Sequence, residues 1–273
     1  MTDTQSTTNT NFSKGLSSEE YENLVQNTPE SEYTIDLTSD PRDRISQREF
    51  ELLNELKKDP ICQGYSDKHL MLFLFGRKYD VKRAIELLTE NTKWRQEHGY
   101  PLDGRILTSQ LNEQLVRSMY SYWIPGTRDK QGRLVGYLFP GRVQIKHYSL
   151  KDQLDFFIWC WDILLDEGLD GHRKGVVYVE DIHGVSLSSF DRKTGAELQK
   201  AVQKFPIRIQ GIYVIGAGWL IRALIGFAKL FMKEKIIGRT KVITKEEVVE
   251  YVDKSELDEV FGGAIQWNAD KFL

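Results

Sequence analysis

The residues that could perform catalysis in this chain are carboxylates, histidines and glycines, and their spacing does not assemble an active site. Glu180 and Asp181 are adjacent at the end of a predicted strand, so their side chains point to opposite faces and form a poor acid–base pair. The five histidines are scattered, and neither a Gly-x-Ser-x-Gly nor a His-Glu-x-x-His pattern occurs. Gly216-Ala-Gly218 begins a dinucleotide-like pattern, but Ile221 replaces its third glycine. We therefore expect a protein that is not an enzyme and that needs no cofactor and no metal.

A different chemistry, binding to an anionic surface, is indicated by the stretch from Lys204 to Lys241. Its middle, Gly216–Met232, is almost entirely apolar, and the whole stretch holds eight bases and one acid, a net charge of +7 in a chain of net charge −3. An apolar helix flanked by cations is typical of contact with an anionic lipid surface. The alternative is a buried core helix with solvated charged ends. Arg222 and Lys229 interrupt the apolar run, so we expect peripheral, reversible membrane contact and not a spanning helix.

Length and composition indicate a globular protein with one large domain and a smaller one. The chain has 273 residues, of which 40% are hydrophobic and 28% are charged. The sequence pI near 6.0 argues against nucleic acid as the main partner. Cys62 and Cys160 form no metal or redox spacing, and the N-terminus lacks the features of a secretory signal. We expect a cytoplasmic monomer that associates peripherally with membranes.

The first hundred residues predict a tail followed by a helical lobe. Residues 1–40 are rich in Thr, Asn, Ser and acids, which predicts a disordered acidic tail, either a shield for the basic stretch or a plain solvated leader. Apolar spacing predicts a helix over Arg42–Lys58. Two more helices follow, with Ser66 and Asp80 as N-caps and Gly99 at the end of the second. Residues 41–103 therefore form an N-terminal helical lobe.

From residue 104 the pattern changes to strands that alternate with helices, which predicts an α/β sheet domain over 104–265 and a short C-terminal tail over 266–273. The predicted strands are Tyr120–Ile124, Leu134–Phe139, Gly175–Ile182, Ile212–Ile215 and Lys241–Ile243. The predicted helices are Leu154–Leu165 and Thr194–Lys204. Leu154–Leu165 is apolar nearly all round, so it must be covered on most sides.

The segment Leu72–Gly99 resembles the N-terminal helical segment of the CRAL-TRIO lipid-binding proteins. Within them the chain is most similar to the secretory-pathway phosphatidylinositol/phosphatidylcholine transfer proteins. The matching blocks, in order along the chain, are Arg77–Val81, Lys93–Arg95, Asp129–Arg133, Asp181–Ser189, Phe205–Gly216 and Phe261–Gly263. The resemblance covers about Ser66 to Gly263, and its blocks fall in the family's order.

The resemblance implies an α/β fold in which a mixed sheet with flanking helices encloses an apolar cavity. A helical gate closes that cavity, and Gly216–Met232 matches the gate. Its apolar character on all sides suits a helix that faces both the cavity and a membrane. Burying an acyl chain removes methylenes from water at roughly 0.8 kcal/mol each, so a soluble lipid carrier requires such a cavity.

The resemblance also implies two groups of headgroup residues. Ser186 and Ser188 match the paired serines that meet a phosphatidylcholine headgroup, and both hydroxyls would face one way in an extended segment. The alternative for them is a cluster of helix-capping serines. The basic residues associated with a phosphoinositol headgroup are matched by Arg77, Lys78, Arg208 and Arg239. The alternative for these four is a set of salt bridges at the lobe interface.

Three further groups follow from the same resemblance and from strand alternation. The expected cavity lining is Trp123, Tyr137, Phe139, Phe157, Trp161, Val177, Val179 and Ile212. The expected gate residues are Trp219, Leu220, Ala223, Leu224, Phe227 and Phe231. The expected membrane-facing cations are Lys229, Lys233, Lys235 and Lys241.

The chain departs from the family pattern at several of these positions. Ile207 stands where the family's inositol site carries a glutamate, which removes an acceptor for inositol hydroxyls. Gly216-Ala-Gly218 replaces an Asn-x-Pro at the hinge, and Leu230 replaces a gate proline. We expect a lipid-binding and transfer protein that holds one phospholipid, phosphatidylcholine and phosphatidylinositol being the candidates. The alternatives are a carrier of a tocopherol-, retinoid- or sterol-like molecule and a lipid-gated signalling adaptor.

Overall fold

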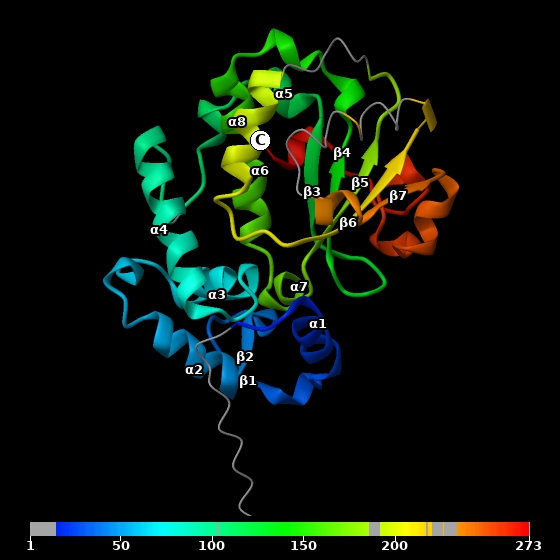
Figure 1. The fold of residues 1–273 in the computed structure, drawn as a ribbon. Coiled ribbons are helices and arrows are strands. Elements are labelled where there is room, and N and C mark those ends of the chain that lie inside the picture. The colour runs from blue at the N-terminus through cyan, green and yellow to red at the C-terminus, as the bar shows by residue number, and fades with distance from the viewer. Residues whose placement is uncertain are drawn as a thin grey trace, which may run out of the picture.

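The computed structural model describes residues 15–102, 104–185, 192–216, 218–219, 226 and 234–272. The N-terminal elements from α1 to α3 form a lower part, α4 rises from it beside the upper part, and a five-stranded sheet with its helices forms the upper part (Figure 1). The N-terminal elements are α1 (Ser18–Asn27), β1 (Tyr33–Asp36), β2 (Arg44–Ser46), α2 (Gln47–Leu56), α3 (Asp67–Gly76) and α4 (Val81–His98).

The three helices α2, α3 and α4 pack against one another as the predicted helical lobe. Helices α3 and α4 begin where the sequence predicts, because the side chains of Ser66 and Asp80 accept backbone N–H bonds in the first turn. Gly99, with φ of 72°, ends α4 in the left-handed conformation. The run of residues 70–75 in α3 is buried throughout, so α3 forms the centre of this core.

The prediction of a disordered tail over residues 1–40 is wrong for residues 15–40, which are folded. Helix α1 begins at a capping box formed by Ser17 and Glu20, and its Tyr21 is fully buried. The prediction used the low apolar content of all 40 residues. The apolar side chains of α1 are few, but they share one face, and an average over the segment does not show this. Residues 1–14 lie outside the described residues.

The upper part is a mixed sheet in the order β3-β4-β5-β6-β7, which makes β5 the central strand. β3 and β4 are antiparallel, and the other neighbours are parallel. The strands are β3 (Ser121–Arg128), β4 (Leu134–Leu138), β5 (Val176–Asp181), β6 (Ile209–Ile215) and β7 (Thr240–Ile243). The helices are α5 (Glu113–Arg117), α6 (Leu150–Leu165), α7 (Leu169–Lys174), α8 (Arg192–Val202) and α10 (Glu234–Ile237). The predicted mixed sheet with flanking helices is confirmed.

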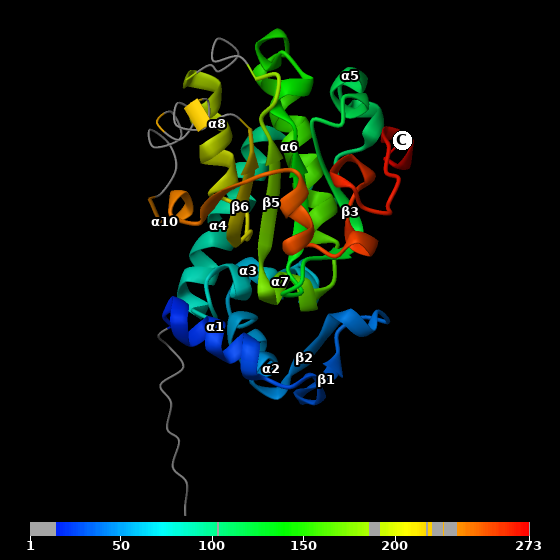
Figure 2. The ribbon, with the colours of Figure 1, turned by 90° about the vertical axis from the view of Figure 1, so that its right-hand side faces the viewer.

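Different elements cover the two faces of the sheet (Figures 1 and 2). Helix α6 covers one face, which we call the α6 face, and Trp123 belongs to the same apolar cluster as the buried side chains of α6. The C-terminal segment 246–272 covers the other face, where Tyr122 and Val179 cluster with Phe261. Both faces are therefore buried, and the register decides which side chains share a face.

Helix α6 is buried along nearly its whole length, as its sequence predicts. Its two buried aspartates each have a partner. The Tyr100 hydroxyl donates to Asp155 at 2.8 Å, and the Arg95 guanidinium pairs with Asp162. These partners compensate the loss of water around the carboxylates, which would otherwise be costly inside an apolar core. Across the described ranges, no helix has the length and hydropathy that crossing a bilayer requires.

A buried hydrogen bond fastens the C-terminal segment to the sheet, because the Tyr122 hydroxyl donates to Asp258 at 3.1 Å. We expect Tyr122→Phe to lower the free energy of unfolding by about 1 kcal/mol, since Asp258 then loses one of its donors. Chemical denaturation measures the change. Tyr120→Phe is the control, because its hydroxyl makes no hydrogen bond within the described part of the chain; equal effects of the two variants would contradict the prediction.

Candidate functional site

Four of the eight side chains predicted to line a cavity lie on the α6 face of the sheet or on α6 itself. Trp123 and Ile212 belong to strands of the sheet, and Phe157 and Trp161 belong to α6. The ring centroids of Trp123 and Tyr178 are 5.0 Å apart, and those of Phe157 and Trp161 are 5.8 Å apart. Ile212 pairs with Tyr178 in the register of β5 and β6, so it lies on the same face. The α6 face is therefore rich in aromatic side chains.

The other four residues predicted to line the cavity lie on the opposite face, so the prediction of one shared lining is wrong. Tyr137 and Phe139 stack on Phe261 of the C-terminal segment, with ring centroids 5.7 and 5.5 Å apart. Val177 and Val179 are fully buried in the same cluster. Strand alternation shows which side chains of one strand share a face. It does not show which of two apolar faces α6 covers.

Glu180 is a polar residue on the α6 face whose position the sequence did not single out as a binding site. It lies two residues after Tyr178 on the central strand, and its cross-strand neighbours are Leu138 and Val214. Burial raises the pKa of its carboxyl to about 7. The carboxyl has no ion-pair partner among the described residues. The sequence pattern that could have revealed this position is a single carboxylate two residues after Tyr178, on the same face of the strand.

The adjacent Asp181 is hydrogen-bonded within the turn that follows it. Its carboxylate accepts the backbone N–H of His183 at 3.0 Å. Because Asp181 is bonded within this turn and follows Glu180 directly in the strand, the two carboxyls do not form an acid–base pair. Nowhere in the described ranges do His, Cys, Asp and Glu side chains gather into a group that could hold a metal ion.

The basic residues predicted to meet a phosphoinositol headgroup lie around one connection, Phe205–Ile209, which leads into β6. A Cβ at Gly76 would lie 3.1 Å from the backbone of Pro206, so Arg77 sits close to this connection. Among the described residues, the Arg77 side chain makes one hydrogen bond, its Nη1 donating weakly to the Gly76 carbonyl at 3.4 Å, and burial lowers its pKa. Arg239 donates to the Ile209 carbonyl, and burial lowers its pKa too. Neither guanidinium has a carboxylate partner in the described part of the chain.

The remaining two headgroup candidates are occupied by the N-terminal helix α1. Arg208 forms an ion pair with Glu22 at 2.7 Å and donates to the Arg173 carbonyl at 2.7 Å. Its guanidinium also lies 4.4 Å from the centre of the Tyr21 ring. The ammonium of Lys78 donates to the hydroxyl of Ser18. The structure therefore separates the four cations into a pair bonded to α1 and the pair Arg77 and Arg239, which has no carboxylate partner among the described residues.

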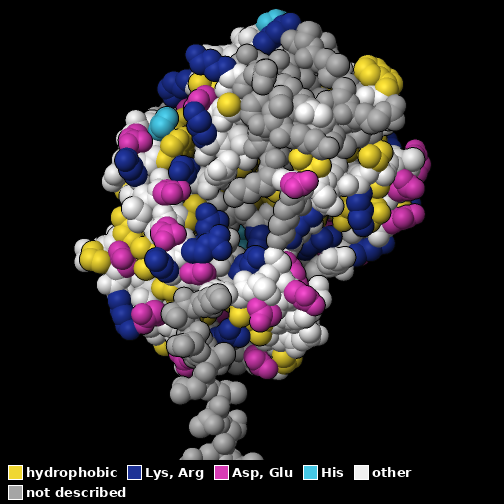
Figure 3. Space-filling view, in the orientation of Figure 1, with side chains coloured by type: hydrophobic (Ala, Val, Ile, Leu, Met, Phe, Trp, Pro, Cys, Tyr) yellow, Lys and Arg dark blue, Asp and Glu magenta, His cyan; other side chains and the backbone are white. Residues whose placement is uncertain are grey.

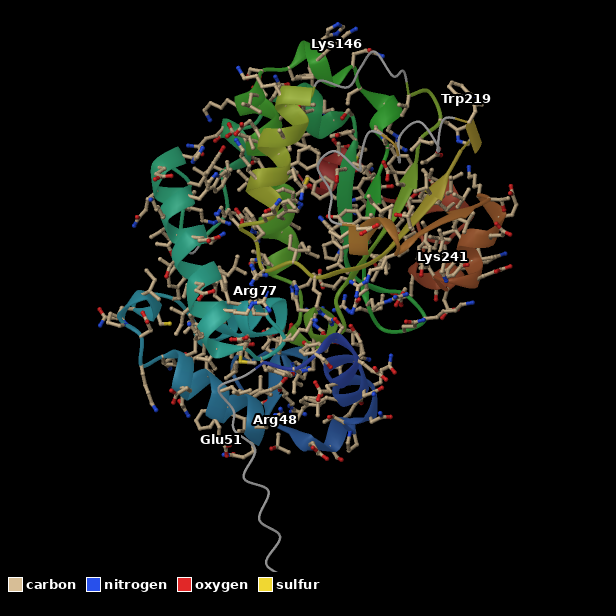
Figure 4. All side chains as sticks on the ribbon, in the orientation of Figure 1. Arg48, Glu51, Arg77, Lys146, Trp219 and Lys241 are labelled. Carbon is tan, nitrogen blue, oxygen red and sulfur yellow. The ribbon has the colours of Figure 1, made fainter. Side chains whose placement is uncertain are left out.

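Lys and Arg side chains gather where the lower and upper parts meet, as the space-filling view shows (Figure 3). Arg77 lies at this junction, while Trp219 and Lys241 lie on the upper part (Figure 4). The side chain of Trp219 is 63% exposed, unusual for a residue of its size. Lys241 is exposed on β7, with its ammonium 5.4 Å from the ring centre of Tyr251.

Several predicted site residues lie outside the described residues. These are Ser186, Ser188, Leu220, Ala223, Leu224, Phe227, Lys229, Phe231 and Lys233. Lys235 belongs to α10, and its side chain is likewise not described. The paired serines, most of the gate and most of the predicted membrane-facing cations therefore remain predictions from the sequence.

Comparison with known proteins agrees with this architecture. The family model of the CRAL/TRIO domain matches residues 117–263. A CRAL-TRIO domain-containing protein of Dictyostelium discoideum is 31% identical over 238 residues, which cover 81% of this chain and 92% of that protein. The phosphatidylinositol/phosphatidylcholine transfer protein SFH9 of Arabidopsis thaliana is 26% identical over 85% of this chain, which spans 43% of its length. The crystal structure of Sfh5 has the same fold, with a TM-score of 0.59 at 15% identity over 83% of this chain and 91% of that one.

The chain belongs to the CRAL-TRIO family of lipid-binding proteins. The resemblance seen in the sequence is thereby confirmed, and the family match begins at residue 117, in α5, so that α1 to α4 precede it.

Proposed function

We propose that this protein carries one phospholipid between membranes, binding it on the α6 face of the sheet. The proposal rests on the α6 face, which is apolar and aromatic, and on the two arginines without carboxylate partners that lie near it. Arg77 and Arg239 lack carboxylate partners in the described ranges at the junction of the two parts. Guanidinium groups without carboxylates suit a phosphate, which they bind through forked, charge-assisted hydrogen bonds.

The lipid is phosphatidylcholine in this proposal, with phosphatidylinositol as a second cargo. Ser186 and Ser188 would meet the choline headgroup, since they follow the carboxyl end of β5 in the chain. Arg77 and Arg239 would meet the phosphate of an inositol lipid at the other end of the sheet. Ile207 supplies no acceptor for inositol hydroxyls, so phosphatidylinositol would bind through its phosphate alone. No covalent step is involved, and the protein acts without a cofactor.

Lipid exchange would take place at a membrane surface from a monomeric, cytoplasmic protein. Supporting observations are the exposed Trp219, a residue of the predicted gate, and the exposed Lys241 on β7. Indole rings favour the level of lipid headgroups, and lysine ammonium groups are attracted to anionic lipids.

We expect Trp219→Ala to lower the affinity for vesicles of phosphatidylcholine and phosphatidylserine several-fold, because an inserted indole contributes apolar contact at the headgroup level. Vesicle co-sedimentation measures the effect. Leu107→Ala is the matched control, since Leu107 is 65% exposed but lies outside the predicted gate. Unchanged vesicle binding by Trp219→Ala would mean that the Trp219 indole does not insert into the membrane.

The proposed function is tested by mass spectrometry of the lipids that the purified protein extracts from a total membrane preparation. Recovery of phosphatidylcholine, alone or with phosphatidylinositol, is the expected result. Recovery of a sterol, tocopherol or retinoid instead would replace the phospholipid by a different hydrophobic cargo. A folded protein that recovers no lipid would favour the signalling adaptor.

A further inference from the structure

Helix α1 docks onto the rest of the protein through one face, which carries Ser18, Tyr21, Glu22 and Val25. Residues three, four and seven positions apart share one side of an α-helix, so these four side chains point the same way. Tyr21 is fully buried and Val25 is 7% exposed, whereas Glu19 is exposed. The docking face meets the end of the sheet at which β6 begins, and α1 lies beneath that end in both views (Figures 1 and 2).

Two polar side chains of this face hold cations that the sequence predicts for an inositol headgroup. The Glu22 carboxylate accepts hydrogen bonds from Arg208 and from Gln210, each at 2.7 Å. Ser18, one helical turn earlier, accepts a hydrogen bond from the ammonium of Lys78. The Arg208 side chain is 9% exposed, and the Glu22 charge balances its own. A single helix therefore occupies two of the four predicted headgroup cations.

The aromatic ring of Tyr21 fixes α1 in this position. Its centre lies 4.4 Å from the Arg208 guanidinium and 5.0 Å from the centre of the Tyr79 ring. Its hydroxyl donates to the Arg173 carbonyl at 3.2 Å. A buried ring with three kinds of contact holds a helix more firmly than one ion pair would, because burial of apolar surface adds to the polar bonds. Removing the Glu22 charge alone should therefore leave α1 docked.

The other two predicted headgroup cations, Arg77 and Arg239, lie close to this occupied pair. Arg239 donates to the carbonyl of Ile209, the residue that follows Arg208 in the chain. Burial lowers the pKa of Arg239, and the charge of Glu22 acts in the opposite direction. The Glu22 carboxylate therefore acts on Arg239 as well as on its direct partner Arg208, and any anion bound at Arg239 meets the negative charge of α1.

We propose that α1 sets the charge of the inositol headgroup that the protein accepts, with Glu22 as the specificity-determining residue. The inference rests on the proposed function. Arg77 and Arg239 suffice for the single negative charge of the phosphodiester in phosphatidylinositol. A phosphate monoester on the inositol ring adds about two more negative charges, which Glu22 repels and for which α1 leaves no further cation. The protein therefore takes phosphatidylinositol in preference to phosphatidylinositol 4-phosphate, which binds only when α1 undocks from Lys78 and Arg208.

The test measures which inositol lipid the protein loads. Wild type and Glu22→Gln are incubated with phosphatidylcholine vesicles that contain equal amounts of phosphatidylinositol and phosphatidylinositol 4-phosphate, and mass spectrometry gives the amounts recovered with the protein. We expect wild type to prefer phosphatidylinositol by roughly tenfold or more. Glu22→Gln should reduce this preference by about tenfold, because it loads more of the phosphorylated lipid. The loading of phosphatidylcholine should be the same for both proteins.

Glu19→Gln is the matched control, because it removes the same charge from an exposed position of the same helix. Hydrogen exchange of the α1 amides in the wild-type protein supplies a second readout, which does not depend on how well a variant folds. These amides should exchange as slowly in protein loaded with phosphatidylinositol as in protein loaded with phosphatidylcholine. They should exchange faster in protein loaded from vesicles whose only inositol lipid is phosphatidylinositol 4-phosphate, since undocking exposes the helix to solvent.

The outcomes separate the role of α1 from the function on which it rests. A wild-type protein that loads both inositol lipids equally would overturn the role of α1 and leave the phospholipid carrier intact. The same holds if Glu22→Gln keeps the full preference, if Glu19→Gln reduces it as much, or if α1 exchanges equally slowly with either inositol lipid bound. Recovery of phosphatidylcholine alone by both proteins would also overturn it. A wild-type protein that recovers no phospholipid would overturn the proposed function together with the role of α1.

Discussion

Replacing Glu49 by alanine is expected to lower the free energy of unfolding by about 3–5 kcal/mol, because it leaves a buried guanidinium without its carboxylate. Arg173 donates to the two Glu49 oxygens at 2.7 and 3.1 Å, and the two side chains are 5% and 3% exposed. The Tyr79 hydroxyl donates to the same carboxylate at 2.6 Å. Glu49 also completes the capping box of α2 with Ser46. Since a domain of this kind has about 5–15 kcal/mol of total stability, the variant loses a large share of it.

Chemical denaturation of the variant and of Glu55→Ala gives the comparison. Glu55 lies on the same helix, but its side chain is 56% exposed, so its removal should change the free energy by less than about 0.5 kcal/mol. A double-mutant cycle with Arg173→Met then isolates the pairwise energy, because removing both charges should restore part of the loss. A loss below about 1 kcal/mol for Glu49→Ala would mean that water reaches the Arg173 guanidinium.

The double variant Arg77→Gln, Arg239→Gln is expected to bind phosphatidylinositol roughly a hundredfold more weakly than wild type and phosphatidylcholine equally well. Each charge-assisted hydrogen bond to a phosphate contributes about 1.5–3 kcal/mol, so two lost contacts account for a factor of this size. The structural basis is that both guanidinium groups lack carboxylates within the described ranges and that burial lowers both pKa values. Equilibrium loading from vesicles that contain both lipids measures the two effects in one experiment.

A structural role for these arginines would give a different result. Within the part of the chain that the structure describes, the Arg77 side chain makes only the weak hydrogen bond to the Gly76 carbonyl, so its replacement should leave the unfolding midpoint nearly unchanged. Lys93→Gln serves as the control for charge alone, since the Lys93 side chain is 76% exposed on α4. If phosphatidylcholine and phosphatidylinositol loading fall together, the arginines support the fold and not a headgroup.

Local signals in the sequence predicted much of the fold. Ser66, Asp80 and Gly99 lie at the helix ends where capping chemistry places them, because a cap depends only on neighbouring residues. The continuous apolar run of α6 and the apolar strand β5 were likewise visible without tertiary information. Thr244 and Glu247 exchange the hydrogen bonds of a capping box, a local pattern that here precedes the 3₁₀ helix Glu246–Glu250.

The features that the sequence did not predict depend on residues far apart in the chain. Nothing local to Arg208 shows that Glu22, 186 residues earlier, is its partner. The alternation in β4 and β5 shows that Val179 and Glu180 face opposite ways. It does not show that Val179 faces the C-terminal segment and Glu180 faces α6, because both faces of the sheet are covered by other elements. The headgroup prediction failed to separate Arg77 from Arg208 for the same reason, because the family motif gives the residue type and not its partner.

The docking of α1 has a consequence for how the protein is made. The Tyr21 hydroxyl bonds to the Arg173 carbonyl, 152 residues later, and Glu22 pairs with Arg208. At about 5–20 residues per second, the ribosome needs about 10–40 seconds to synthesise the chain between Glu22 and Arg208. Helix α1 is thus the first helix of the described chain to be synthesised and among the last to find its binding surface. Until Arg173 and Arg208 have been synthesised, α1 lacks both of these bonds, and its Tyr21 ring can pack only on N-terminal partners such as Tyr79, with ring centroids 5.0 Å apart.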